Sequence, residues 1–360
     1  MSDPDLRGTI ISSVMYDVAD EIDLGRLRAL TRGTPASSSL KHAAPDYVRF
    51  ERPPMVENVE PVSLASGERL EATLQYYDYG VVGLLLRSSF SGSWEQLREL
   101  AARWISGTSL EELSRKIVAA KIEASREALV RGYDQWLSEE YYILHLHGIA
   151  GISTGDELLQ QRGAEISQMV RGENLPLAGE ERNEVLESQM SYYPNDLLVA
   201  GWNAAFLFDT EAGAEPTIRL IEYANSQLLQ FRHYDEVLTR ELDQVYRFLR
   251  SRRQGMFSGW RMGSAAARLR AMLLEVTELT EHTNNALKFV GDMFSARLYK
   301  MVAVKIGVND YQNLVHEKLR TADELYDFMI EQFHQSRGFL LEFIVVLILV
   351  IELFFLFRGK

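Results

Sequence analysis

The stretch Phe339–Phe357 reads FLLEFIVVLILVIELFFLF, and it decides the fold class that the sequence predicts. Seventeen of its nineteen residues are apolar. At about 1.5 Å per residue, a helix of this length nearly spans a hydrocarbon layer about 30 Å thick. Core helices rarely stay apolar around their whole circumference. The pattern therefore predicts one C-terminal transmembrane helix over 338–357.

Two acidic residues, Glu342 and Glu352, interrupt this apolar stretch. A carboxylate in hydrocarbon is costly and usually faces protein or water. Both residues are therefore candidates for contacts between copies of the helix, and they favour a homo-oligomer. A position at the two membrane interfaces and an ion pathway are the alternatives that they leave open.

The chain begins with the acidic segment Met1–Asp5, which has neither the basic nor the apolar region of an export signal. With a C-terminal membrane helix, this predicts a single-pass membrane protein with its bulk in the cytosol. In an organelle, the bulk of the protein would lie in the matrix.

Composition excludes several classes of site. The 360 residues contain no cysteine, which removes disulfides, thiolate zinc sites and iron–sulfur clusters. The formal net charge is -13. Because binding to phosphate backbones depends on Lys and Arg, this charge argues against nucleic acid as a partner. The sequence identifies no cofactor.

The region 1–215 alternates strand and helix patterns and predicts an α+β soluble domain. Two of its predicted strands, Leu70–Tyr77 and Val81–Leu86, are arranged as a hairpin that turns at Asp78-Tyr79-Gly80. The predicted architecture is thus an α+β N-terminal domain, followed by long antiparallel helices and the membrane helix.

The region 216–337 changes to long helices with coiled-coil-like seams. Apolar residues of the first helix recur at alternating spacings of three and four, with Asp235 as one acidic interruption. A second helix is expected over about Ser264–Ile306, and a third begins near Asn309 or Asp310. This region is the predicted long-helix domain.

Two histidines, His145 and His147, are spaced so that a strand would place both on one face. They are weak candidates for a metal site, because no third ligand can be assigned. Solvent-facing or structural histidines are the alternative. The segment Gly148–Gly155 could direct backbone amides toward a phosphate, but it matches neither the Walker nor the dinucleotide pattern.

An arginine cluster lies between the first two long helices, in a chain that is otherwise acidic. In an antiparallel arrangement this connection lies beside the bilayer, where arginines face anionic lipid and aromatic residues occupy the interfacial layer. Packing against a neighbouring subunit is one alternative, and nucleic-acid binding by the arginines is another. The predicted membrane-interface residues are Arg250, Arg252, Arg253, Met256, Phe257, Trp260 and Arg261.

Several segments of the chain resemble the RMD/YagE family of single-pass membrane proteins. They are Asp78–Val82, Tyr193–Asp196, Trp202–Ala205, Glu222–Leu229, Leu287–Asp292, Leu341-Glu342 and Ile351-Glu352. The resemblance implies a membrane-anchored protein of poorly defined biochemistry, whose eukaryotic relatives include mitochondrial inner-membrane proteins that form large homo-oligomers. Because the N-terminus lacks a transit peptide, the resemblance favours a bacterial inner-membrane protein with its bulk in the cytoplasm, and the mitochondrial inner membrane if the protein is organellar. It supplies no catalytic residues.

These features together predict a non-enzymatic, tail-anchored homo-oligomeric scaffold that places a cytosolic α+β domain at the membrane, where it meets an unknown protein partner. An oligomeric ion channel or transporter is one alternative. An enzyme acting on a nucleotide or RNA is the other.

Overall fold

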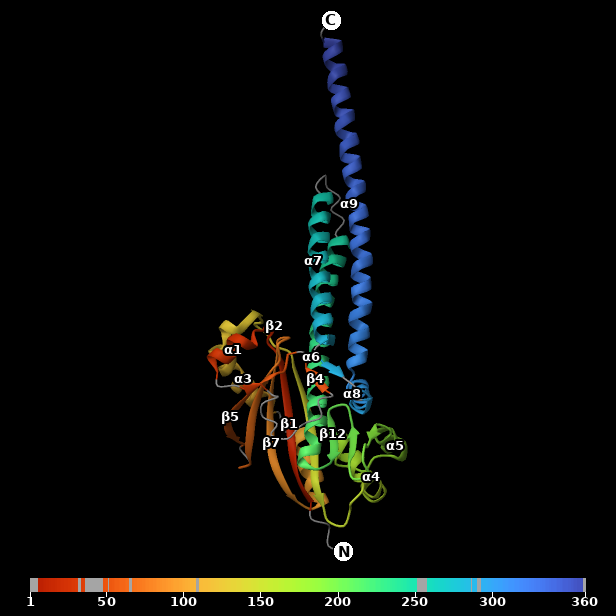
Figure 1. The fold of residues 1–360 in the computed structure, drawn as a ribbon. Helices are drawn as coiled ribbons and strands as arrows, with labels where there is room; N and C mark the ends of the chain where they lie inside the picture. Colours follow the sequence, from red (N-terminus) through yellow and green to blue (C-terminus); the bar gives the residue numbers. More distant parts are fainter. Residues whose placement is uncertain are drawn as a thin grey trace. The chain divides into compact units, whose positions relative to one another are not determined.

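A computed structural model describes most of the chain (Figure 1). The described residues are 6–31, 34–35, 48–50, 52–64, 67–107, 110–250, 258–285, 287–289 and 293–358. They form two compact units. Unit 1 comprises Met1–His233 and Glu281–Tyr311, and unit 2 comprises Tyr234–Thr280 and Gln312–Lys360.

The centre of unit 1 is a mixed sheet to which nine of the described strands belong, in the order β10-β11-β12-β9-β1-β7-β6-β5-β3. Neighbouring strands are antiparallel except β12 and β9, which are parallel. The bounds are β1 Leu6–Asp17, β3 Thr34–Pro35, β5 Met55–Ser63, β6 Arg69–Tyr76, β7 Val81–Gly92, β9 Ser138–Ile149, β10 Gln189–Met190, β11 Leu197–Ala200 and β12 Ala204–Phe208.

Two short strand pairs and several helices complete unit 1. Strand β2 (Ala19–Ile22) pairs with β8 (Leu129–Gly132), and β4 (Val48–Phe50) pairs with β13 (Leu287–Phe289). The helices of this unit are α1 Leu24–Leu30, α2 Trp94–Ala102, α3 Glu111–Ala124, α4 Gly155–Arg171, α5 Gly179–Glu187 and α8 Met293–Lys305, together with the first part of α6 Glu211–Arg250.

The hairpin of β6 and β7 confirms the turn predicted at Asp78-Tyr79-Gly80. Gly80 has a φ of 86°, and a Cβ atom there would lie 1.7 Å from the carbonyl oxygen of Ala19. Only glycine fits this conformation and this close approach. The turn fixes the register in which Tyr76 pairs with Val82 and Thr73 with Leu85.

One face of the sheet forms the main hydrophobic core. Alternate residues of β6, Leu70, Ala72, Leu74 and Tyr76, pack there with side chains of α2, α3 and α4. Helix α2 begins with a capping box in which Ser93 and Gln96 satisfy each other's backbone amides. This face is covered by amphipathic helices.

The opposite face of the sheet meets the first part of α6. Residues 221–231 of this helix are buried at every position, so the helix is enclosed all round. The segment includes polar side chains, and several bond to the sheet or to the turn between β6 and β7. The Tyr79 hydroxyl lies 2.7 Å from the Ser226 hydroxyl, and Gln230 donates to Asp17 at 2.7 Å.

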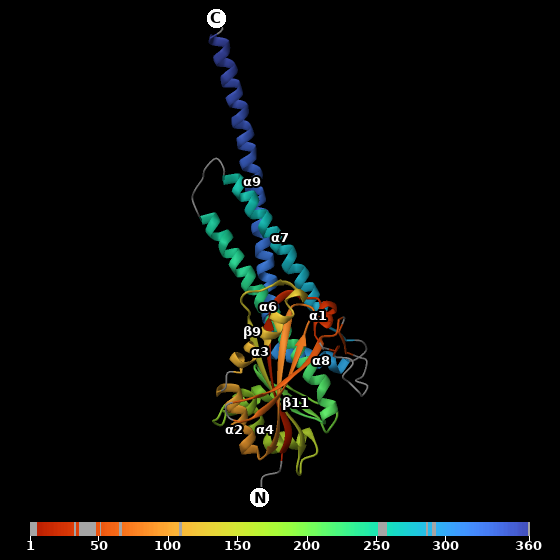
Figure 2. The same ribbon diagram turned by 90° about the vertical axis from the view of Figure 1, so that its left-hand side faces the viewer.

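Unit 2 consists of long helices that run side by side (Figure 2). They are the end of α6, most of α7 (Ser258–Asn285) and most of α9 (Val308–Arg358). Asp235, the predicted acidic interruption of the first seam, accepts a bond from Lys318 of α9 at 2.5 Å. The acidic residue that interrupts the apolar seam thus forms an ion pair with a neighbouring helix.

The structure corrects the predicted architecture. The predicted second helix over Ser264–Ile306 is divided, because Leu287–Phe289 forms strand β13, and α8 follows as a separate helix. The N-terminal α+β region is built on one large mixed sheet. The predicted boundary after residue 215 lies inside α6, and the division into domains stays a prediction.

The predicted transmembrane helix over 338–357 is wrong. Among the residues that the structure describes, no helix combines the length and the apolar composition needed to cross a membrane. These residues instead form the end of α9, a helix of 51 residues in which Glu342 and Glu352 are exposed. The predicted tail-anchored, single-pass placement therefore loses its support.

Candidate functional site

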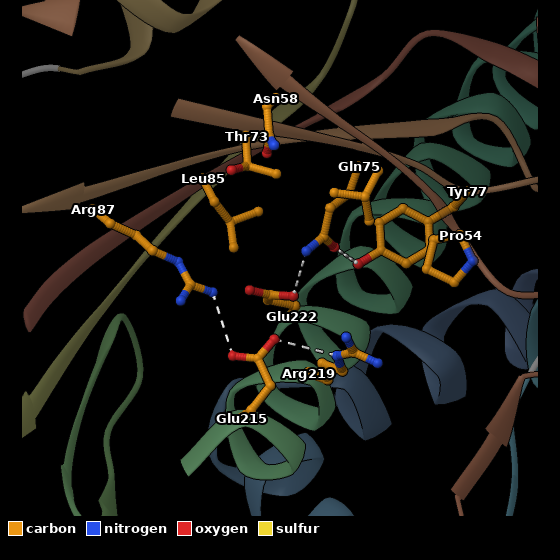
Figure 3. Close-up of a pocket in the computed structure, with 11 residues that line it drawn as sticks. Pro54, Asn58, Thr73, Gln75, Tyr77, Leu85, Arg87, Glu215, Arg219 and Glu222 are labelled. Carbon is orange, nitrogen blue, oxygen red and sulfur yellow. Dashed lines mark hydrogen bonds and ion pairs between the residues drawn. The ribbon is translucent and has the colours of Figure 1, made fainter. Parts of the chain in front are cut away.

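A cavity of about 190 Å³ lies in unit 1 between α6 and the strands β5, β6 and β7 (Figure 3). Its lining combines apolar, amide, hydroxyl and charged side chains. The lining residues are Pro54, Val56, Asn58, Thr73, Gln75, Tyr77, Leu85, Arg87, Glu215, Arg219 and Glu222.

The pairing register of strands β5, β6 and β7 determines which of their residues line the cavity. Asn58 of β5 lies opposite Thr73 of β6, which lies opposite Leu85 of β7. Val56 lies opposite Gln75 in the next row of the same face. Because side chains alternate across a strand, these residues face α6 while their sequence neighbours face the main core.

Helix α6 supplies the charged side of the cavity. Glu215, Arg219 and Glu222 are spaced by four and three residues, which places them on one face of the helix. Arg219 Nε lies 3.4 Å from Glu215, and Arg87 of β7 lies 3.6 Å from the same carboxylate. Glu215 therefore lies between two guanidinium groups.

Glu222 is the most unusual group in the cavity. It is 1% exposed. Its Oε2 accepts a hydrogen bond from Gln75 Nε2 at 3.0 Å, whereas Oε1 has no hydrogen-bond partner among the described residues. Burial disfavours the charged form and raises the pKa of Glu222 to about 7, although nearby Arg87 opposes part of the rise.

Tyr77 orients the amide that binds Glu222. Its buried hydroxyl donates to Gln75 Oε1 at 2.8 Å, so the Gln75 amide nitrogen is directed at the carboxyl group. Burial and the neighbouring Glu222 raise the pKa of Tyr77 well above its usual value. Tyr77 therefore acts as a neutral hydrogen-bond donor.

The arrangement offers a ligand three kinds of contact. Arg87 supplies guanidinium donors, Leu85 and Pro54 supply apolar surface, and Glu222 can donate or accept a proton near neutral pH. A cavity with a few convergent polar groups and a carboxyl group of perturbed pKa is a typical small-molecule site.

A second buried polar cluster joins α6 to β1. Asp17 is fully buried, and its Oδ2 lies 2.7 Å from His233 Nδ1. The His233 ring stacks on Tyr133 with centroids 4.7 Å apart. Burial raises the pKa of Asp17, and the hydrogen bond from His233 opposes that rise. This pair fixes one end of the buried α6 segment.

The predicted metal residues, His145 and His147, lie on β9 with ring centroids 5.9 Å apart. His145 is buried and bonds the carbonyl oxygen of Asp209, while His147 lies 3.5 Å from Glu211. Burial lowers the pKa of His145. No group of three or more His, Cys, Asp or Glu residues in the described chain is placed to hold a metal ion. The metal site stays a prediction.

The predicted membrane-interface residues fall mostly outside the described residues. This holds for Arg252, Arg253, Met256 and Phe257, and for the side chains of Trp260 and Arg261 on α7. Arg250, at the end of α6, is exposed. Their role stays a prediction, as does the role of Glu342 and Glu352 in contacts between copies.

Sequence reasoning missed the cavity because its residues come from two distant segments, 54–87 and 215–222. One signal was present. Residues 222–230 read EYANSQLLQ, in which five polar residues are spread over about half of the circumference of a helix that also carries an apolar seam. A helix buried all round must bury those polar groups as well.

Comparisons with known proteins identify relatives of unit 1. Residues 7–215 match the model of a family described as the N-terminal domain of the uncharacterized protein MJ0711. The chain is 21% identical over 208 residues to protein MJ0711 of Methanocaldococcus jannaschii, which covers 58% of this chain and 63% of that protein. No solved structure matches. The match replaces the predicted resemblance to the RMD/YagE family, which is wrong.

Proposed function

Because the chain belongs to the family of the MJ0711 N-terminal domain, whose description states no activity, we propose its function from the cavity: unit 1 binds a small polar molecule there. The observation that carries the proposal is the buried residue Glu222, which lines the cavity and whose Oε1 atom has no hydrogen-bond partner among the described residues.

The energetics of Glu222 support a binding role. A buried polar atom without a partner costs about 1–3 kcal/mol, and more when it is charged. A ligand that bonds this oxygen removes that cost and is therefore stabilised in the cavity. The family match ends at residue 215, so Arg219 and Glu222 lie beyond it.

The size of the cavity limits the ligand. A cavity of about 150 Å³ holds a benzene molecule. A cavity of about 190 Å³ thus fits a compound of similar or slightly larger size. A complete nucleotide exceeds this volume, so a nucleotide is a poor candidate for full enclosure.

A screen of small metabolites by thermal unfolding tests the proposal. We expect at least one compound to stabilise the protein, because a ligand at about 100 times its Kd adds about 2.7 kcal/mol. Thr73→Trp would fill the cavity and abolish the effect. Ser89→Trp is the matched control, since Ser89 is exposed on β7 and does not line the cavity.

The screen can contradict the proposal in two ways. Either no compound stabilises the wild-type protein, or the stabilisation survives in the Thr73→Trp variant. Folding of both variants is checked beforehand by circular dichroism.

Acid–base catalysis on the bound molecule is a second candidate function. The pKa of Glu222 near 7 favours it, since a catalytic acid or base works best near the operating pH. Chemical change of a bound compound, lost in Glu222→Gln while binding remains, would separate catalysis from binding alone.

The predicted association of copies through the long helices remains a separate proposal. Native mass spectrometry of the purified protein tests it directly. A stable monomer would exclude the oligomeric scaffold without affecting the ligand proposal.

A further inference from the structure

We infer that the ligand of the cavity is a small organic carboxylate, held between the Arg87 guanidinium and the Glu222 carboxyl group. The inference names the chemical class of the ligand and rests on the proposed function. It follows from the hydrogen bonds of these two groups, the charge of the lining and the apolar part of the cavity.

Arg87 has unused capacity to bind an anion. Among the described residues its one ion-pair partner is Glu215, at 3.6 Å, and this distance is too long for a hydrogen bond. Figure 3 shows the guanidinium directed from β7 toward the centre of the lining. A guanidinium group matches a carboxylate with two parallel N–H donors.

The charges of the lining favour an anion over a cation. The lining contains two arginines, Arg87 and Arg219, and two acids, Glu215 and Glu222. When Glu222 is protonated, one positive charge is in excess. An entering carboxylate neutralises this excess, whereas a cationic group would be repelled by both guanidinium groups.

Hydrogen bonding places the proton of Glu222 on the correct atom. Gln75 Nε2 donates to Oε2, so the neutral carboxyl group carries its proton on Oε1. Oε1 is the atom without a partner among the described residues. It can therefore donate to one ligand oxygen while Arg87 binds the carboxylate from the other side.

The groups facing Glu222 set the sign of the pH dependence. They are Arg87 on β7, Gln75 on β6, Tyr77 directly after β6, and Glu215 and Arg219 on α6. Arg87 and Arg219 favour the ionised form of Glu222, and Glu215 disfavours it. A bound carboxylate adds a second negative charge beside Glu222, and the two groups then share one proton. Binding therefore takes up a proton.

The apolar part of the lining indicates what kind of group the ligand carries besides its carboxylate. Leu85, Val56 and Pro54 contribute hydrocarbon to the cavity, which suits a short aliphatic chain. Inorganic phosphate lacks such a chain. It also carries more negative charge than a carboxylate, so the Glu215 carboxylate repels it more strongly. The lining thus fits an aliphatic carboxylate better than phosphate.

Isothermal titration calorimetry of the full chain with straight-chain carboxylates from acetate to hexanoate tests the inference. Titrations in two buffers of different ionisation enthalpy measure the protons exchanged. We expect binding with proton uptake, and an affinity that falls up to about tenfold per pH unit above about pH 7. Butyramide, the uncharged match of butyrate, and inorganic phosphate are titrated alongside, and both should bind much more weakly than butyrate.

Two variants, Arg87→Ala and Glu222→Gln, test whether these residues bind the carboxylate and take up the proton. Arg87→Ala should weaken carboxylate binding about tenfold or more, since a hydrogen-bonded charge pair is lost. Arg98→Ala is its control, because Arg98 is 34% exposed against 32% for Arg87 and has a comparably loose ion pair at 4.0 Å. It should leave binding unchanged.

Glu222→Gln should retain carboxylate binding, because the amide can still donate, and should remove the proton uptake. Glu140→Gln is its control, since Glu140 on β9 also has a buried oxygen without a partner among the described residues but does not line the cavity. Proton uptake should persist in that variant.

The outcomes separate this inference from the proposed function. Absence of carboxylate binding, tighter binding of phosphate, unchanged affinity in Arg87→Ala, or uptake that persists in Glu222→Gln would each overturn the carboxylate. If uncharged metabolites still bind and Thr73→Trp abolishes their binding, the proposed function stands with another ligand class. If nothing binds, both fail.

Discussion

The two faces of the large sheet use the same strands for different purposes. On β6, Leu70, Leu74 and Tyr76 face the main core, where α2, α3 and α4 cover them. Thr73 and Gln75 of this strand face α6 and line a cavity, together with Tyr77 directly after the strand. The first face is closely packed with apolar side chains, which stabilises the fold. The second face borders a cavity and buries polar groups. A site can thus lie one residue away from a well-packed core.

The largest expected effect concerns the first face. Leu74 is fully buried, and Leu74→Ala should lower the free energy of unfolding by about 2–5 kcal/mol. Thr73→Ala, one position away on the second face, should cost less than about 1 kcal/mol. Urea unfolding followed by circular dichroism measures both. Equal losses would show that the two faces do not differ in packing.

The next effect concerns Glu222 and pH. Its pKa rises from an ordinary 4.5 to about 7 on folding, so the unfolded chain loses this proton first as pH rises. Stability should therefore fall from about pH 4.5 to above about pH 7, by about 3 kcal/mol in total. Glu222→Gln should remove this part of the fall.

Urea unfolding at a series of pH values compares the wild-type protein with this variant. Asp17 and Glu139 also have raised pKa values and remain in both proteins, so they contribute equally. Parallel pH profiles for the two proteins would contradict the prediction.

A smaller effect distinguishes two adjacent tyrosines. Tyr77 donates to Gln75 on the cavity face, and Tyr76 donates to Glu57 at 2.9 Å on the other face. Removing either hydroxyl with Phe should cost about 1 kcal/mol. Only Tyr77→Phe should raise the pKa of Glu222 further, because Gln75 then loses its fixed orientation.

Carbon-13 NMR titration of the Glu222 carboxyl group measures that shift, with Tyr76→Phe as the matched control. A shift of the same size in both variants would indicate a general loosening of the sheet. No shift in either would mean that Tyr77 does not orient the amide.

The sequence predicted those features of the fold that depend on neighbours along the chain. The β6–β7 hairpin was correct, since its turn needs a glycine at position 80. The long helices were found from their seams, although β13 divides the predicted second one. Its pairing with β4 joins residues more than two hundred positions apart, and no local pattern shows that contact.

The candidate site could not be predicted in the same way. Register brings Asn58, Thr73 and Leu85 into one row, and α6 then places Glu222 above the sheet. A single acid in a helix usually marks a solvated face, so the sequence alone gives no reason to expect that Glu222 is buried. At the C-terminus, the apolar composition of residues 339–357 led to the wrong prediction of a separate transmembrane helix. In the structure these residues are the last part of the longer helix α9.

The complete burial of residues 221–231 has a consequence for motion. Amides in a helix enclosed on every side open only with the folded unit, so their hydrogen exchange should be among the slowest in the protein. The wall that carries Glu222 is therefore rigid before any ligand arrives. Such preorganisation limits the ordering that accompanies binding. Selectivity then depends on the fit of the ligand to a fixed shape.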